Sequence, residues 1–141
     1  MQSIKWDRRF LHLATQVAGW SKDPSTGVGA VIVRPDRTIA SLGYNGFPRG
    51  VADTYEDRDH KLLRTVHAEL NAILSAREPL SGCIIYSTLC PCSNCAAAII
   101  QAGIAGVVSY NTERPDWRAS FEASADMFLQ ANVATTYYPP R

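Results

Sequence analysis

The sequence lacks a long hydrophobic run, and it lacks an excess of charge of either sign. No run of apolar residues reaches the length of about 20 residues that a membrane-spanning helix needs. Lysine and arginine number 14 against 13 aspartate and glutamate residues, for a formal net charge of +1. This balance argues against the strongly basic surface that binds polymeric nucleic acid. We therefore expect neither a membrane nor a polymeric nucleic-acid partner.

The N-terminal segment lacks the continuous apolar centre of a secretion signal, because Lys5, Asp7 and Arg8 interrupt it. We therefore expect a cytoplasmic protein, in which thiols stay reduced. The 141 residues fit one domain, 1–141, and a hydrophobic fraction of 46% allows a buried core.

What the sequence does contain is clustered cysteine. Three of the four cysteines, Cys90, Cys92 and Cys95, lie close together. In a reducing compartment such a cluster indicates a metal or catalytic site rather than a disulfide framework. Cys92 and Cys95 stand at the predicted start of a helix, with a spacing that lets both sulfur atoms reach one ion.

Hydrophobic periodicity and turn residues predict an α/β protein with a mixed sheet of about five strands. A two-stranded antiparallel hairpin comes first, and the later strands alternate with helices and are expected to run parallel. The predicted helices cover residues 1–20, a short piece of the charged segment 51–65, 66–77, 93–101 and 116–131. The predicted strands cover 28–34, 38–44, 83–89, 106–110 and 133–138.

His67, Cys92 and Cys95 are the candidate metal ligands. Imidazole nitrogen and thiolate sulfur suit Zn²⁺, and a site with three protein ligands keeps one position open for water, as catalytic zinc sites do. Two predicted helix starts, after Val66 and after Pro91, direct their positive ends at these ligands. The other cysteines and histidines are expected in packing or surface roles: Cys83, Cys90, His12 and His60.

Glu69 follows His67 by two positions, a spacing that places a carboxylate beside the metal without making it a ligand. The pattern H-x-E…P-C-x-x-C is the signature of zinc-dependent nucleobase deaminases. There the metal lowers the pKa of a bound water towards about 7, and the glutamate carries a proton to the ring nitrogen and then to the departing ammonia. Taken alone, Glu69 would be an ordinary first-turn acid of a helix.

Four segments carry a resemblance to a known family: 21–30 (SKDPSTGVGA), 43–51 (GYNGFPRGV), 66–73 (VHAELNAI) and 91–95 (PCSNC). They resemble the deoxycytidylate (dCMP) deaminases of the cytidine deaminase superfamily, in particular the bacterial and phage type. The resemblance implies a three-layer α/β/α cytidine deaminase-like domain in a bacterial or phage-infected cytosol. It also implies hydrolysis of dCMP to dUMP and ammonia, in the supply of dTTP precursors.

The resemblance also implies roles in substrate binding. Asn45 resembles the asparagine that holds the deoxyribose 3′-hydroxyl, and Lys22 resembles the phosphate contact; outside its motif, Lys22 would be a solvated loop lysine. The other expected contacts are Val28 and Tyr110 beside the pyrimidine ring, backbone groups of Ala68, Thr88 and Pro91 at its polar edge, and Arg114 and Arg118 as further phosphate candidates.

Family members are often homohexamers that dCTP with Mg²⁺ activates and dTTP inhibits. The resemblance places the residues of this regulatory nucleotide site at Tyr44, Gly46, Phe47 and Arg49. Some members hold a second, structural zinc. Here the segment before His67 offers His60 but no cysteine, so we do not expect that ion.

Several alternatives stay open at this point. One alternative is a substrate pocket that takes dCTP as well as dCMP. The zinc motif is also shared with deaminases of free (deoxy)cytidine and of nucleic acid. A zinc-containing module that binds nucleotides without converting them is a further alternative, and Glu69 argues against it because mere binding does not need that carboxylate.

Overall fold

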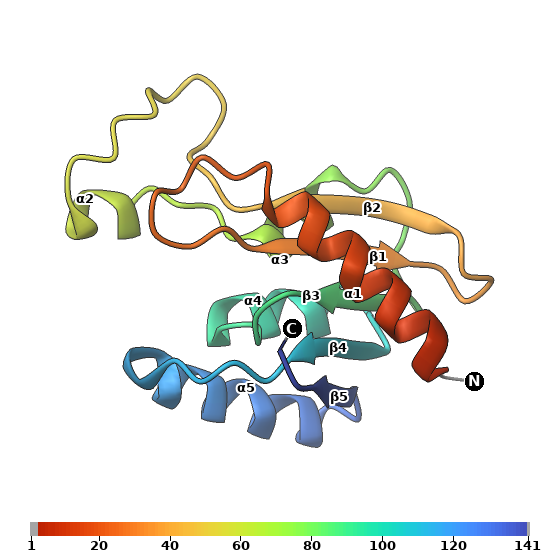
Figure 1. Ribbon diagram of the computed structural model, residues 1–141. Helices are drawn as coiled ribbons and strands as arrows, with labels where there is room; N and C mark the ends of the chain where they lie inside the picture. The colour runs from red at the N-terminus through yellow and green to blue at the C-terminus, as the bar shows by residue number, and fades with distance from the viewer. Residues whose placement is uncertain (1–2, 141) are drawn as a thin grey trace.

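The computed structural model describes residues 3–140, whose elements closely follow the predicted ones (Figure 1). In chain order they are α1 (Ile4–Ala18), β1 (Gly29–Val33), β2 (Ile39–Tyr44), α2 (Arg58–Leu62), α3 (Ala68–Ser75), β3 (Ile84–Ser87), α4 (Ser93–Gln101), β4 (Gly106–Tyr110), the 3₁₀ helix η1 (Pro115–Trp117), α5 (Arg118–Gln130) and β5 (Ala134–Tyr138). No helix among the residues described has the length and apolar character needed to cross a membrane.

The five strands form one mixed sheet in the order β2-β1-β3-β4-β5. Strand β1 runs antiparallel to both of its neighbours, β2 and β3. Strands β3, β4 and β5 run parallel. The predicted hairpin, the parallel later strands and the mixed sheet are therefore confirmed.

The sheet lies between α1 on one face and α3, α4 and α5 on the other (Figure 1). Alternate residues of β1 point to opposite faces: Val31 and Val33 join the α1 side of the core, whereas Ala30 and Ile32 join the other side. Covering both faces explains why all five residues of β1 are buried. The expected three-layer α/β/α arrangement is confirmed.

Two glycines allow helices to pack directly on the hairpin backbone. A Cβ atom at Gly29 would lie 2.0 Å from the carbonyl oxygen of Ala14 in α1. One at Gly43 would lie 2.5 Å from the backbone nitrogen of Ala72 and 2.6 Å from the carbonyl oxygen of Ala68, both in α3. The close contact at Gly43 thus sets how near α3 lies to strand β2, and α3 is the helix that follows the candidate ligand His67.

Gly43→Ala is expected to lower the free energy of unfolding by about 1 to 3 kcal/mol, because an added methyl group overpacks the β2–α3 contact. Urea unfolding measures the change. Gly46→Ala is the matched control, since a Cβ at Gly46 would meet nothing within 4 Å. Equal stability of the two variants would contradict the proposed role of this close approach.

The charged segment 51–65, which contains α2, extends from the rest of the molecule at the left of Figure 1. No residue of α2 is buried, so side-chain contacts hold it in place. Arg58 forms an ion pair with Asp116 of η1, and Lys61 forms one with Asp23 in the loop before β1. The segment is thus tied to two loops on either side of one end of the sheet.

Candidate zinc and catalytic site

Two helices begin next to each other at the site. His67 is the N-cap residue of α3, and Cys92 is the N-cap residue of α4. Cys95 lies in the first turn of α4, and α3 packs against α4. Because the N-terminus of a helix carries partial positive charge, both helices favour anionic groups here.

The three predicted ligands come together in a geometry that fits zinc. Their ligand atoms all lie within 4.8 Å of one another. His67 Nδ1 is 3.2 Å from Cys92 Sγ and 3.5 Å from Cys95 Sγ. Tetrahedral zinc with ordinary Zn–N and Zn–S bonds requires N···S separations of about 3.5 Å. The donor set and its spacing therefore suit a Zn²⁺ ion with a fourth position left open.

The groups around Cys92 favour the thiolate form of its sulfur atom, which attracts a cation. The hydrogen bond from the Cys95 thiol holds the pKa of Cys92 well below its usual range, against the opposing effect of burial, and His67 adds to the lowering. Cys92 thus carries thiolate character, which is the form that binds metal. Cys90 differs: its thiol points towards the carbonyl oxygen of Tyr110, 3.6 Å away, and burial raises its pKa.

Glu69 lies beside this cluster and is only 3% exposed. Burial raises the pKa of its carboxyl group to about 7, while the charge of His67 pulls it in the opposite direction. A carboxyl group with a pKa near neutrality can both accept and release a proton in the course of a reaction. Its burial and its place in the first turn of α3 thus suit it to acid–base work.

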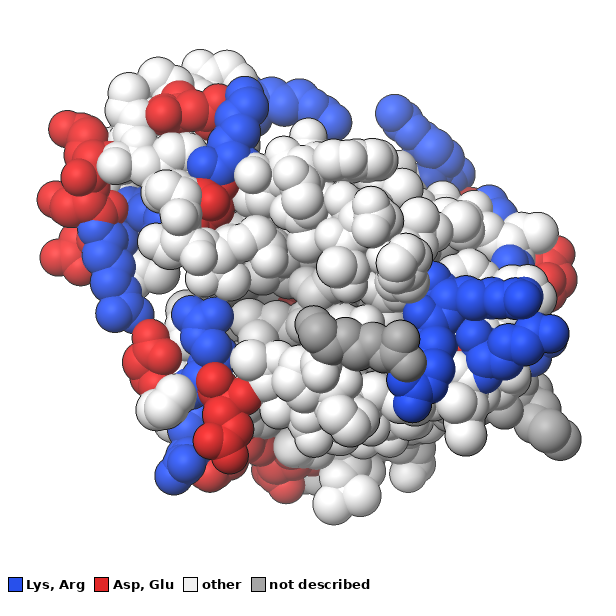
Figure 2. Space-filling view, viewed as in Figure 1, with Lys and Arg blue, Asp and Glu red and all other residues white. Residues whose placement is uncertain are grey.

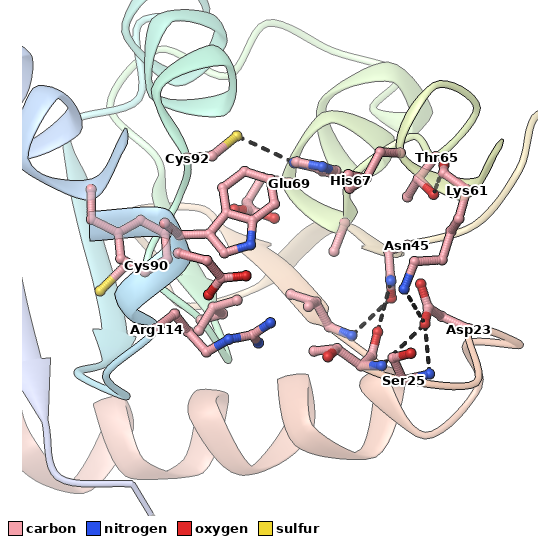
Figure 3. A pocket seen from close by; sticks show the side chains of 18 of the residues that line it. Asp23, Ser25, Asn45, Lys61, Thr65, His67, Glu69, Cys90, Cys92 and Arg114 are labelled. Atoms are coloured by element: carbon pink, nitrogen blue, oxygen red, sulfur yellow. Dashed lines mark hydrogen bonds and ion pairs between the residues drawn. The ribbon is translucent and has the colours of Figure 1, made fainter. Parts of the chain in front are cut away.

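A cavity of about 320 Å³ opens over the cluster (Figure 3). Its walls come from both loops that α2 contacts, from α2 itself and from the starts of α3 and α4. The lining residues are Asp23, Ser25, Thr26, Val28, Asn45, Arg58, Lys61, Leu62, Thr65, His67, Ala68, Glu69, Leu89, Cys90, Cys92, Arg114, Asp116, Trp117 and Phe121.

Several residues expected to bind substrate line this cavity, namely Val28, Asn45, Ala68 and Arg114. The side-chain amide of Asn45 accepts a hydrogen bond from the backbone of Val28 at 2.8 Å and donates one to the carbonyl oxygen of Thr26 at 2.9 Å. Asn45 therefore ties the loop before β1 to the hairpin and holds that wall of the cavity in place.

The other expected substrate contacts lie outside the cavity lining. The backbone N–H of Thr88 donates to Gly29, and the carbonyl oxygen of Pro91 accepts a hydrogen bond from Ser124. Tyr110 packs on the α1 side of the core. The Lys22 side chain is 74% exposed, and its ammonium group pairs with Asp53 at 3.0 Å. These positions give no support to the expected contacts of Tyr110 with the base and of Lys22 with the phosphate.

The four residues expected at a regulatory site do not share one environment. Gly46 pairs with Val66 through the backbone, and Tyr44 is exposed and stacks edge-on against Trp20. The ring centroid of Phe47 lies 4.4 Å from that of Tyr55, a residue of the segment 51–65. Arg49 is exposed. Their predicted role stays a prediction.

Sequence reasoning missed a group of cavity residues, among which Asp23, Lys61 and Trp117 are the most informative. The ring of Trp117 lies edge-on to His67 at 6.0 Å between centroids. Lys61 precedes His67 by six residues and Thr65 precedes it by two, and this closeness in sequence was the available signal. It was weak because charged segments are usually solvated.

The chain matches the family model described as the cytidine and deoxycytidylate deaminase zinc-binding region over residues 4–111. The chain belongs to this family. It is 49% identical, over 96% of its length and 95% of the relative, to an uncharacterized deaminase in the luxG 3′ region of Aliivibrio fischeri. It is 38% identical to human deoxycytidylate deaminase, over 95% of this chain and 79% of the relative.

The family fold extends to solved structures. The dCMP deaminase of cyanophage S-TIM5, in complex with dCMP and dUMP, aligns with a TM-score of 0.80 at 22% identity, over 98% of this chain and 100% of that chain. At this identity the likeness establishes the cytidine deaminase-like fold. Family membership and the His67–Cys92–Cys95 geometry together make this chain a zinc-dependent deaminase.

Proposed function

We propose that the protein hydrolyses dCMP to dUMP and ammonia. The observation that carries the proposal is the buried Glu69 carboxyl group beside the His67–Cys92–Cys95 cluster, at the wall of a cavity of nucleotide-binding size. The relatives named deoxycytidylate deaminase support dCMP as the substrate.

In the reaction water replaces the exocyclic amino group of cytosine, so protons must move from the water to the base and to the leaving nitrogen. When bound by His67, Cys92 and Cys95, zinc supplies a Lewis acid that makes water a stronger nucleophile at neutral pH. The Glu69 carboxylate accepts a proton from the attacking water and delivers it to N3 of the ring. It then takes the second water proton and gives it to the amino nitrogen, which leaves as ammonia.

The cavity wall holds the nucleotide in place for these transfers. We infer that Asn45 bonds to the deoxyribose and that Val28 contacts the pyrimidine ring, since both line the cavity. A cavity of about 320 Å³ is at the small end of the range for small-molecule sites. In Figure 2, acidic and basic side chains alternate at the left end, where α2 lies, rather than forming a continuous basic track. Both features favour a single nucleotide over a polymer.

Finer points of the function are part of the same proposal. They are the use of dCTP as a second substrate, regulation by dCTP with Mg²⁺ and by dTTP, assembly into a homohexamer, and action in the cytoplasm in the supply of dTTP precursors. The family resemblance of the hairpin loop at Asn45 and Gly46 supports the regulatory part.

A substrate panel tests the proposal. We expect kcat/KM for dCMP to exceed that for deoxycytidine, and an oligonucleotide to release no ammonia. Runs with dCDP and dCTP, each with and without added dCTP or dTTP, measure the phosphate preference and any regulation. Faster turnover of deoxycytidine or of the oligonucleotide than of dCMP would contradict the proposed substrate.

A further inference from the structure

Three cationic side chains line the cavity: Arg58, Lys61 and Arg114. They differ in exposure and in the acidic partners that they already have. Arg58 is paired with Asp116 at 3.1 Å, and its side chain is 63% exposed, so that solvent screens its charge. Lys61 and Arg114 are available to an anionic ligand, each for a different reason.

Lys61 is sequestered and held in place. Its side chain is 16% exposed, and the Asp23 side chain that it contacts is 5% exposed. Lys61 Nζ donates to Asp23 Oδ1 at 3.2 Å, its one acceptor among the described residues. An ammonium group has three N–H donors, so two remain for a ligand in the cavity.

Asp23 is organised to hold that lysine. Its Oδ1 atom accepts the backbone N–H groups of Ser25 at 2.8 Å and Thr26 at 3.1 Å. Burial alone would raise the pKa of Asp23, but these two N–H groups and the Lys61 ammonium hold it below its ordinary value. The carboxylate therefore stays charged at neutral pH and fixes the direction from which Lys61 enters the cavity.

Arg114 enters from the other side. Figure 3 shows its side chain reaching into the cavity from the wall opposite to Lys61 and Asp23. Within residues 3–140 the Arg114 guanidinium has no hydrogen-bond or ion-pair partner. A partly buried guanidinium without a carboxylate partner is well suited to a phosphate group, which it can bind through two parallel hydrogen bonds.

We propose that Lys61 and Arg114 bind the substrate phosphate from opposite walls of the cavity, with Asp23 as the positioning residue for Lys61. This inference rests on the proposed function, because it assumes a nucleotide monophosphate. It assigns the lysine contact to Lys61 in α2 instead of Lys22, whose ammonium is exposed and paired outside the cavity. It also assigns a role to the segment 51–65, since that segment contains Lys61, one of the two residues of the proposed phosphate site.

The test compares how variants discriminate between dCMP and deoxycytidine, which differ only in the phosphate. In Lys61→Met and in Arg114→Met we expect the ratio of the two kcat/KM values to fall about 10- to 100-fold, the worth of a hydrogen bond to a charged group. Turnover of deoxycytidine should fall less than turnover of dCMP, and zinc content should stay at the wild-type level. Lys61→Arg should recover part of the ratio, and Lys5→Met, at an exposed position of α1, should keep all of it.

The outcomes separate this inference from the proposed function. If the wild-type protein fails to deaminate dCMP, the proposed function fails and the inference fails with it. If the wild type acts on dCMP but Lys61→Met and Arg114→Met keep its ratio within about twofold, or if Lys22→Met lowers the ratio more than either, the inference alone is wrong. Should Lys61→Met misfold after losing its contact with Asp23, Arg114→Met decides, because that side chain has no partner to lose.

Discussion

Replacing Glu69 by glutamine is expected to lower kcat for dCMP by about 10³-fold or more, the upper part of the range for loss of a general acid–base. Glutamine has the same shape but neither accepts nor releases a proton at neutral pH. One carboxyl group is assigned both proton transfers, to N3 and to the leaving amine, so its loss affects every stage. Steady-state rates of dUMP formation measure the change.

Binding controls show whether the loss is chemical. Glu69→Gln should keep its zinc and its affinity for dUMP, because Glu69 is not assigned as a ligand of either. Glu78→Gln is the matched substitution: Glu78 pairs with Arg34 at a distance from the cavity, and its loss should leave kcat near the wild-type value. A Glu69→Gln variant with more than about a tenth of wild-type kcat would remove Glu69 from the proton-transfer role.

Cys92→Ala is expected to lose most of its zinc and, with it, deaminase activity. With Cys92 replaced, only two of the three assigned ligands remain, too few for a stable zinc site with one open position. Metal analysis of the purified variant measures zinc per chain independently of activity. Dialysis of the wild type against a chelator should give the same loss of activity, and added Zn²⁺ should restore it.

Cys90→Ala is the matched control, since Cys90 is a near neighbour of Cys92 in the sequence and its thiol points to the Tyr110 carbonyl oxygen instead of the cluster. This variant should hold as much zinc as the wild type. Loss of zinc from Cys90→Ala, or retention by Cys92→Ala, would show that the ligand set is wrong.

The order and type of the elements could be predicted because local patterns specify them. Val31 and Val33 alternate with Ala30 and Ile32 across a strand, and Gly103 follows the helix 93–101 at a positive φ of 79°. The order of the strands within the sheet could not be predicted from such local patterns. Nothing local indicates that β1 lies between β2 and β3, because that pairing joins residues more than fifty positions apart, such as Ala30 and Ser87.

The residues of the site also divide into those that the local sequence predicts and those that it does not. His67, Glu69, Cys92 and Cys95 could be predicted because their spacing within two short segments is what the chemistry needs. The phosphate-binding end could not, since it depends on long-range pairs such as Lys61 with Asp23. In sequence Lys61 is one charge among many in 51–65, and only its burial against Asp23 distinguishes it from the solvated Lys22.

The most direct test of the central claim is the conversion of dCMP by the zinc-loaded protein in ¹⁸O-labelled water, followed by mass spectrometry. Hydrolytic deamination replaces the amino group by one oxygen atom from water. We therefore predict dUMP that carries a single ¹⁸O atom on the base, together with one equivalent of ammonia. Unchanged dCMP, or dUMP without the label, would contradict the account.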